Sequence, residues 1–506
     1  MTTTTSHGRW LIGLGLSALA LWVYWPVFDL ALLGWDTWPM ILTARVQSWG
    51  DLWGCVSESM MDGRYPHGEY YRPVTNLFFA LDHALGGLEP SAYHRTDWLI
   101  HLATTLLMAA LAARLFPRLH GLRIAAVAGV LFCLHPIHLE LVTAPPRRAD
   151  TLCLLFTLAC LLSQSLPGRD AGTRGRWMGA LFAFLAVGSK ETGAVVLPVA
   201  FAWHTCFVQG PCTLFERLRH GARRTVPILI GVGVLLGIRT LVLGGLGGPL
   251  PIAELEPVSR SELFGSLIER AVLPMPLWGW STVDWPYLPL LAASLLVVGA
   301  VRLSRTAQAV EQESSHAPQA GSVLAFLGLW SLAVLGITSF ADQMRDWYAL
   351  LLSAPVVLVI ARGLMTDISQ WRTWEIPSLV VFPLVSLVFL ARGWPLEPTP
   401  RLHAMSTLAR QDLLRLEEGV LSTPDGAFLR LNPWHPMLPP ASDGAGVHSL
   451  YSAFDYSLQA WCELRWPERS IEVISWYQDK NPQPRPGVLT VQLIPGPEPG
   501  WVKDLP

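Results

Sequence analysis

Long apolar runs are the feature that most constrains the fold of this 506-residue chain. A helix needs about 20 predominantly apolar residues to cross a bilayer. About eleven segments qualify or come close, and the short pair within 177–208 fits this length least well: 10–33, 97–116, 123–142, 150–166, 177–189, 193–208, 225–245, 284–302, 321–340, 347–362 and 375–393. The pattern predicts a mainly α, multi-pass transmembrane helical bundle.

The composition agrees with a membrane protein and excludes one class of partner. Charged residues make up 15% of the chain and hydrophobic residues 51%, whereas a soluble domain carries about 25% charge. The formal net charge is −2, and the sequence shows no basic face or tail. We therefore expect no nucleic-acid binding.

Arginines in the short connections predict the orientation of the bundle, because cytoplasmic loops are enriched in Lys and Arg. They fall on one side of the predicted helices: Arg9, Arg118, Arg123, Arg169, Arg174, Arg176, Arg217, Arg219, Arg223, Arg224, Arg302, Arg305, Arg362 and Arg372. The N-terminus is thus expected in the cytoplasm and the C-terminus outside. The same rule predicts a helix pair within 177–208, with SKETG (189–193) as its outer bend; one long tilted helix is the alternative.

Two large segments are expected outside the membrane. The first outer segment, 34–96, contains a helix after Pro73 with apolar residues at 74, 77, 78, 81 and 85, a stripe suited to the membrane interface. In the tail, 402–420 has the pattern of an amphipathic helix, and 470–478 and 487–494 alternate like strands around a proline-rich turn. We expect a membrane module at 1–394 and a small α+β domain at 395–506.

Ionisable residues are concentrated in HPIHLELVTAPPRRAD (135–150), which lies between two apolar runs. Charged groups at such positions are costly and mark a functional site by default. Further polar residues are expected at a comparable depth on the outer side. Together they predict one cavity at the outer leaflet: Asp36, Arg72, His135, His138, Glu140, Arg148, Asp150, Lys190, Glu191 and Arg345.

The balance of these groups suits a lipid-linked phosphate. Arginine presents a planar fork that matches phosphate oxygens, and lysine presents a point charge. Cations that neutralise a leaving polyprenyl phosphate can take the place of a general acid. One carboxylate then suffices as general base for an acceptor hydroxyl, whereas glycosidases need two carboxylates across the bond. This balance favours glycosyl transfer over hydrolysis.

Several motifs carry a family resemblance: YYRPVTNLFFALDHALGGLEPSAYH (70–94), His101, LFCLHPIHLELVTAPPRRADTL (131–152) and SKETGAVVLP (189–198). They resemble the GT-C-type membrane glycosyltransferases, most of all the transmembrane and tetratricopeptide-repeat O-mannosyltransferases and their bacterial relatives. The resemblance covers about the first 210 residues, and the later helices only through Arg345 and Tyr348. It implies a GT-C-like multi-pass fold, here expected in a bacterial inner (plasma) membrane with the C-terminal domain periplasmic.

The resemblance also implies roles for single residues. An acidic residue in the first outer loop acts as base in this family, and Asp36 occupies that position. A second adjacent acid, frequent in the family, is replaced here by Trp35 and Thr37. Arg72 matches a cation near the lipid phosphate. The tetratricopeptide array is absent, and 395–506 takes its place.

Each assignment has a plainer alternative. Asp36 can be an ordinary helix-end acid, and Arg72 can extend to lipid headgroups. His135, His138 and Glu140 admit a divalent metal, but Pro136 distorts the turn and no third ligand is set by spacing. A structural hydrogen-bond network or a substrate contact is therefore favoured, and no cofactor is firmly expected.

The remaining charged residues are expected to pair locally. Arg148 and Asp150 are candidates for an ion pair that holds the loop, and Arg147 for a solvated neighbour. Lys190 and Glu191 are adjacent on the chain, so they should point apart and find separate partners.

Together these observations predict an inverting membrane glycosyltransferase that moves a mannose-like sugar from a polyprenyl-phosphate donor to a protein, lipid or glycan hydroxyl. Asp36 is the expected base, and the expected phosphate ligands are Arg72, Arg148, Lys190 and Arg345. The expected supporting network is His135, His138, Glu140, Asp150 and Glu191. A transporter or flippase of lipid-linked saccharide is an alternative, although no internal symmetry typical of transporters is visible. An inactive scaffold of the same fold is another.

Overall fold

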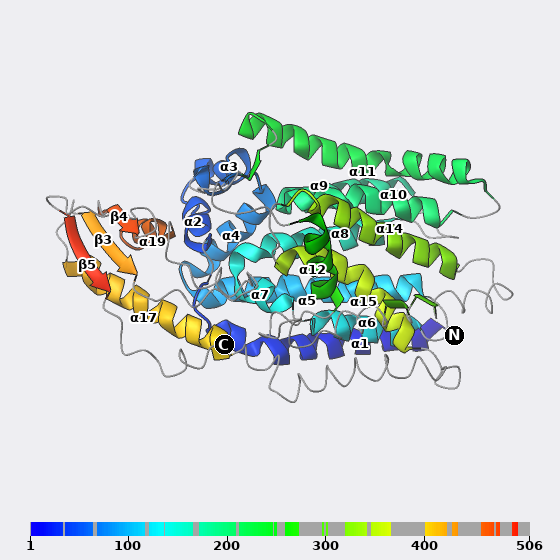
Figure 1. Cartoon of the computed structure of the whole chain (residues 1–506), viewed down its shortest axis with the longest axis horizontal. Helices are drawn as coiled ribbons and strands as arrows, with labels where there is room; N and C mark the ends of the chain where they lie inside the picture. Colours follow the sequence, from blue (N-terminus) through cyan, green and yellow to red (C-terminus); the bar gives the residue numbers. More distant parts are fainter. Residues whose placement is uncertain are drawn as a thin grey trace.

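The computed structural model describes most of the bundle and parts of the C-terminal region (Figure 1). The described residues are 2–33, 36–63, 68–116, 121–135, 137–164, 172–208, 212–245, 247–249, 259–272, 296–297, 300–301, 319–341, 346–365, 400–422, 428–433, 457–469, 472–475 and 488–493. Helices dominate these residues, and the long ones lie side by side along one axis.

Five of the described helical segments are long and apolar enough to cross a bilayer: His7–Asp29, Pro90–Leu115, Leu214–Leu243, Gly321–Thr338 and Trp347–Leu364. They comprise α1 (Thr2–Tyr24) with η1 (Trp25–Asp29), α5 (Pro90–Leu115), α11 (Leu214–Leu243), α14 (Ala320–Thr338) and η6 (Asp346–Ala349) with α15 (Leu350–Leu364). The predicted mainly α, membrane-spanning class is confirmed. The expected spans at 375–393 and most of 284–302 lie outside the described residues, so the count of about eleven stays a prediction.

The predicted span 123–142 is wrong in its second half. Helix α6 (Gly121–Cys133) ends early, and a short α7 (His138–Thr143) and η3 (Pro145–Arg147) lead into α8 (Arg148–Ser163). Prolines at 136, 145 and 146 explain the break, because proline has no N–H to continue a helical hydrogen-bond ladder. The charged stretch therefore lies on the short α7 and η3 and on the first turn of α8, at one end of the bundle.

The segment 177–208 forms two helices, as predicted, and not one. Helix α9 (Gly172–Ser189) is followed by the short η4 (Glu191–Val195) and by α10 (Val196–Cys206). The bend is tight: a Cβ added at Gly193 would lie 2.4 Å from the carbonyl oxygen of Ala186. Helices α9 and α11 also approach closely, since a Cβ at Gly231 would lie 2.3 Å from the carbonyl oxygen of Ala180. Small residues allow such backbone contact between membrane helices.

The first outer segment forms short elements at one end of the bundle, which we call the α2 end (Figure 1). They are α2 (Thr37–Thr43), α3 (Trp49–Ser57), η2 (Met60–Gly63), β1 (Gly68–Glu69) and α4 (Pro73–Gly86). Helix α4 begins directly at a proline, a favourable first helical residue, and it exposes Leu77, Leu81 and Leu85 as a stripe. Strand β1 pairs antiparallel with β2 (Gly248–Pro249), beyond the end of α11.

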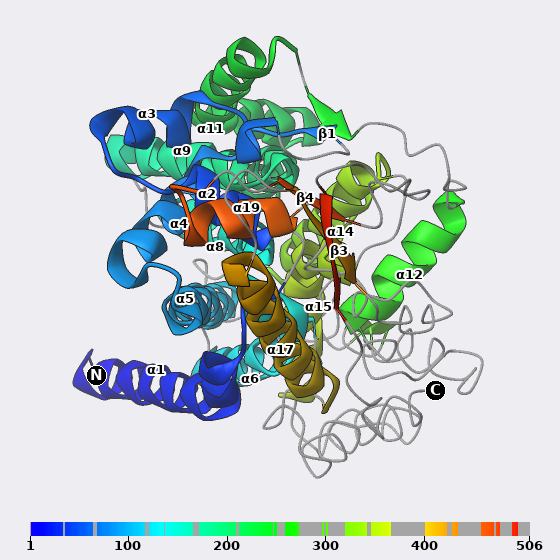
Figure 2. The ribbon, with the colours of Figure 1, turned by 90° about the vertical axis from the view of Figure 1, so that its left-hand side faces the viewer.

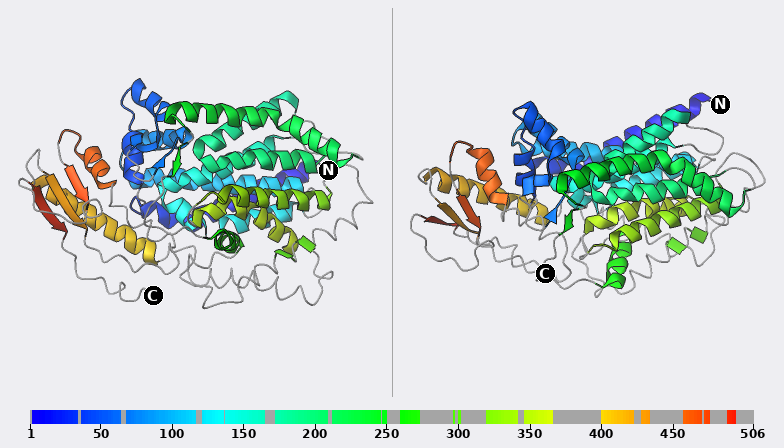
Figure 3. Two further views of the ribbon diagram at one scale, coloured as in Figure 1. Left: turned by 45° about the horizontal axis from the view of Figure 1, so that its top comes forward. Right: turned by 90° about the horizontal axis from the view of Figure 1, so that it is seen from above.

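The C-terminal unit projects beyond the α2 end, as Figure 3 shows from two angles. It consists of α17 (Pro400–Ser422), β3 (Phe428–Pro433), α19 (Ser457–Arg465), β4 (Glu472–Ser475) and β5 (Val488–Leu493). The two predicted strands are present, but they are not neighbours around a turn. Strand β3 lies between them, and both pair with it in parallel. Parallel pairing needs a crossover, and α19 lies between β3 and β4. The two strands therefore do not pair with each other across the proline-rich turn, and the small α+β domain at 395–506 stays a prediction.

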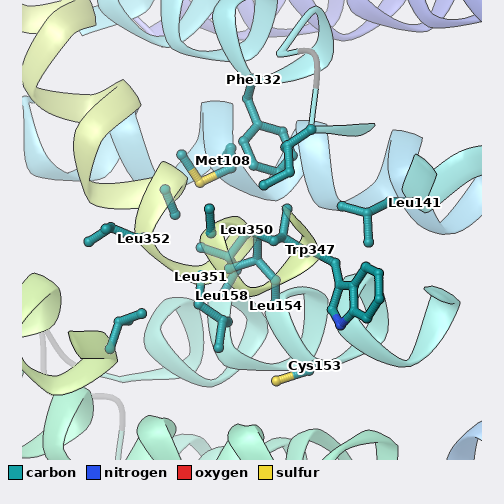
Figure 4. Packing of buried hydrophobic residues seen from close by; sticks show 14 of the residues in the cluster. Met108, Phe132, Leu141, Cys153, Leu154, Leu158, Trp347, Leu350, Leu351 and Leu352 are labelled. Atoms are coloured by element: carbon teal, nitrogen blue, oxygen red, sulfur yellow. The ribbon is translucent and has the colours of Figure 1, made fainter. Parts of the chain in front are cut away.

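The apolar core joins α5, α6, α8 and α15 (Figure 4). Met108 and Phe132 face Leu154, Leu158 and Leu350, all of them buried. The same cluster continues without a break into the C-terminal unit. Helix α12 (Arg260–Val272) packs beside α15 and η6. The core therefore holds the helix breaks, where the charged residues lie, in fixed positions.

Candidate functional site

The expected site residues that the structure describes gather at the α2 end, which faces the viewer in Figure 2. Elements that end or break there are η3, η4 and η6, together with the start of α4 and the end of α11. Among the described residues, two groups of three or more charged side chains form at this end, in addition to the Arg147–Glu140 pair.

The first group, the open cluster, consists of Arg72, Asp150, Lys190, Glu191 and Arg239. Arg72 and Glu191 form a two-pronged ion pair with N–O distances of 3.0–3.3 Å. Nη1 of Arg239 lies 3.8 Å from the same carboxylate. Nζ of Lys190 lies 2.6 Å from Oδ1 of Asp150. The prediction that Lys190 and Glu191 take separate partners is confirmed, and the cluster holds three cations against two carboxylates.

Solvent reaches part of the open cluster, since the side chains of Arg72 and Glu191 are 15% and 28% exposed. Burial opposes the charge of Arg72, but its pairing with Glu191 prevails and raises the pKa of the guanidinium. Burial likewise opposes the charge of Glu191, and Arg72 prevails and holds the pKa of that carboxyl below its ordinary value. Burial lowers the pKa of Lys190, against the opposing effect of Asp150. Arg72 and Glu191 thus hold each other in the charged state.

Aromatic rings on η6 flank the open cluster. Nζ of Lys190 lies 5.4 Å from the centre of the Tyr348 ring. The guanidinium of Arg147 lies 3.5 Å above the Trp347 ring, and its Nε lies 3.3 Å from Oε1 of Glu140. The expectation that Arg147 is a solvated neighbour is therefore wrong, because a carboxylate and an indole ring hold it. Arg345, an expected phosphate ligand, lies outside the described residues.

The second group, the closed triad, consists of Arg148, Asp82 and Asp97. Nη1 of Arg148 lies 2.5 Å from Oδ2 of Asp82, and its Nε lies 2.8 Å from Oδ1 of Asp97. Its Nη2 donates to the carbonyl oxygen of Tyr93 at 3.3 Å, and the Phe79 ring packs beneath it at 4.3 Å. The three charged side chains are at most 1% exposed.

The closed triad corrects one expectation and adds residues that sequence reasoning missed. Arg148 does not pair with Asp150, because residues two apart on a helix do not face each other. Nor does the structure bring Arg148 into the open cluster. The acids that hold it, Asp82 and Asp97, were not recognised as site residues. The sequence did offer an indication of them, since each is a carboxylate within or beside an apolar helix, and a carboxylate in such a place needs a buried partner.

The histidines of the charged stretch are buried against helices. Nε2 of His135 lies 3.0 Å from the carbonyl oxygen of Ala271, and its Nδ1 accepts from the N–H of Ile137 at 3.3 Å. A carbonyl only accepts, so this geometry requires a proton on Nε2. The His138 ring lies 4.3 Å from that of His101. Within the described part of the chain, no three His, Cys, Asp or Glu side chains are grouped to hold a metal.

Asp36 lies at the start of α2, whose residues Thr37 to Ile41 are buried. The Thr37 hydroxyl donates to the carbonyl oxygen of Leu33 at 2.6 Å and ties this start to the preceding chain. Helix α2 contacts both η3 and η2. In η2, the sulfur of Met60 lies 3.7 Å from Nη1 of Arg72. Asp36 itself is partly exposed. It lies at the α2 end together with the open cluster, and α2 contacts η2 and α4, the two elements beside Arg72.

The chain is homologous over part of its length to protein O-mannosyl-transferases. Human TMTC2 is 33% identical over 186 residues, which cover 34% of this chain and 22% of TMTC2. Human TMTC4 is 28% identical over 254 residues, which cover 44% of this chain and 34% of TMTC4. The chain thus spans about a third or less of the length of these relatives. The homology confirms the resemblance in the motifs.

Two further comparisons are less informative. No family model matches the chain. The apo structure of ArnT from Cupriavidus metallidurans aligns over 89% of this chain and 76% of ArnT, with 14% identity and a TM-score of 0.47.

Proposed function

We propose that this protein is an integral membrane glycosyltransferase that transfers a mannose-like sugar from a polyprenyl-phosphate donor to a protein hydroxyl, with inversion. The names of its relatives support the sugar and the protein acceptor. The observation that carries the proposal is the open cluster at the end of the membrane bundle, in which three cations meet two carboxylates and the Arg72–Glu191 pair is partly exposed.

The open cluster is suited to a phosphate. Arg72 offers a planar set of N–H donors that now meets the Glu191 carboxylate, a group with much the same geometry as two phosphate oxygens. Lys190 and Arg239 add positive charge beside it. Charge that develops on the leaving phosphate oxygen would be stabilised there without proton transfer. Arg72 and Lys190 are the phosphate ligands in this proposal, whereas Arg148 is held by two buried carboxylates and serves the structure.

Asp36 is the proposed general base. The acceptor hydroxyl gives its proton to the Asp36 carboxylate as its oxygen attacks the anomeric carbon. The bond from that carbon to the phosphate oxygen breaks, and polyprenyl phosphate leaves with the bonding electrons. A single displacement of this kind inverts the anomeric centre.

We further propose that the α2 end faces away from the cytoplasm. The described ends on the opposite side carry arginines, at the starts of α9 and α11 and near the start of α1: Arg9, Arg174, Arg176, Arg217, Arg219, Arg223 and Arg224. This distribution agrees with the enrichment of cations in cytoplasmic loops.

An Asp36→Asn variant tests the proposal in reconstituted membranes with radiolabelled polyprenyl-phosphate mannose and peptide acceptors. Loss of the base should lower the transfer rate by about 100-fold or more. Glu58→Gln, at an exposed acid within the first outer segment (34–96), is the matched control and should keep wild-type transfer. Wild-type transfer by Asp36→Asn would refute the base, and absence of transfer by the wild type from polyprenyl-phosphate sugars would refute the function.

A further inference from the structure

The C-terminal unit contacts the chain immediately before Asp36. The Ala31 N–H donates to Oγ of Ser406 on α17 at 2.8 Å, in a buried position. One turn further along α17, the guanidinium of Arg410 donates to the carbonyl oxygen of Asp29. Backbone groups upstream of Asp36 thus depend on side chains that come from more than 370 residues later in the chain.

The same unit also contacts the chain immediately after Asp36. Helix α19 packs against α2. The rings of Trp38 and Trp461 meet edge to face, with their centres 6.5 Å apart. Both side chains are almost fully buried, at 4% and 6% exposure. In Figure 1, α2 lies between α19 and α4.

Helix α2 cannot hold its place by its own stability. It has seven residues, whereas isolated helices shorter than about 12 residues are marginal in water. Its position is therefore set by what packs on it, which is α19 of the C-terminal unit and the bundle elements η2, α4 and η3. The C-terminal unit supplies one wall of that packing.

We propose that the C-terminal unit is a positioning element for Asp36. Ser406 and Trp461 hold the two sides of the segment that carries the base, and so set the distance between Asp36 and the open cluster. This inference rests on the proposed function for the role of Asp36, but the contacts themselves do not. The unit acts on the base through residues 29–43, by hydrogen bonds to the backbone of Asp29 and Ala31 and by the ring contact between Trp38 and Trp461.

Kinetics of two variants test the inference in the full-length protein, reconstituted in vesicles. Trp461→Leu and Ser406→Ala should lower kcat by about 10- to 100-fold, since a misplacement of about 1 Å has such an effect. The KM for the lipid donor should stay unchanged, because the open cluster keeps its contacts. Trp461→Phe should recover most of kcat, since it keeps an aromatic edge against Trp38. Leu414→Ala, on an exposed position of α17, is the matched control.

Hydrogen exchange gives a readout that does not need activity. In both variants the amides of residues 29–43 should exchange faster, while those of α8 and α9 keep the wild-type rate. Unchanged kcat with faster local exchange would overturn the positioning role, and so would faster exchange throughout the chain. Failure of Asp36→Asn to lose activity would instead refute the proposed base, while the exchange result would still report on the contacts.

Discussion

The closed triad and the open cluster use the same residue types in opposite ways. Each places an arginine between helices and against carboxylates. In the triad one cation meets two acids, and the side chains are at most 1% exposed. In the open cluster three cations meet two acids, and Arg72 and Glu191 are 15% and 28% exposed. Burial and charge balance, and not residue type, separate a structural ion pair from a candidate ligand site.

The triad nevertheless supports the cluster. It joins α4 through Asp82, α5 through Asp97 and α8 through Arg148. Arg72 directly precedes α4, and Asp150 lies two residues after Arg148 on α8. A shift of α4 relative to α8 would therefore separate the two halves of the open cluster. The buried pairs contribute to the fixed geometry of the site without contacting a ligand.

The largest expected effect on stability comes from removing the central cation of the closed triad. Arg148→Met leaves two carboxylates buried without a counter-charge, and we expect a loss of about 3–5 kcal/mol in the free energy of unfolding. Thermal unfolding in detergent, followed by size-exclusion chromatography, measures it. The triple variant Arg148→Met, Asp82→Asn, Asp97→Asn should recover much of the loss, since no buried charge remains. A single variant as stable as the wild type would contradict the structural role of the triad.

Substitutions in the open cluster should change the affinity for the lipid donor and leave the stability of the protein unchanged. Arg72→Gln should raise the KM for the lipid donor by about 10- to 100-fold, or about 1.4–2.8 kcal/mol, because a phosphate ligand is lost. Glu191→Gln breaks the same ion pair but increases the excess of cations, so its KM should stay level or fall. Steady-state kinetics over donor concentration compare the two. An equal rise in both variants would mean that Arg72 serves only to hold Glu191.

A smaller change should displace the open cluster and leave the triad in place. In Gly193→Ala the new Cβ would lie 2.4 Å from the Ala186 carbonyl oxygen. Relief of this clash should move η4, with Lys190 and Glu191, at a cost of about 1–3 kcal/mol. We expect a several-fold rise in donor KM and a modest fall in melting temperature. Gly328→Ala, where a Cβ meets nothing within 4 Å, is the control. Wild-type KM in Gly193→Ala would show that the bend does not position the cluster.

Predictions from local sequence were correct where the physical cause is local. Adjacent residues point apart, and Lys190 and Glu191 take separate partners. Arginines flanking 177–208 indicated two helices, and two are present. The same kind of reasoning did not find β3, whose six residues are strand only because β4 and β5 pair on both sides of it.

Partner choice could not be predicted, because it depends on which helices cross. Arg148 was expected to pair with Asp150, two residues away, but pairs with acids 51 and 66 residues away. Arg147 was expected to be solvated, but its guanidinium lies over the ring of Trp347, 200 residues later in the chain. Asp82 and Asp97 were visible as acids beside apolar residues, yet nothing in their own segments indicates a shared guanidinium.

The sequence by itself determined the membrane-spanning helical class, the break within 177–208 and the end of the bundle at which charge collects. These follow from apolar run length, from flanking arginines and from the cost of burying charge, all of which act within one segment. Only the tertiary structure decided which cations are fully buried against carboxylates and which remain partly exposed. It alone brought the C-terminal unit against the Asp36 segment, because contacts between residues more than 370 apart depend on the packing of the whole chain.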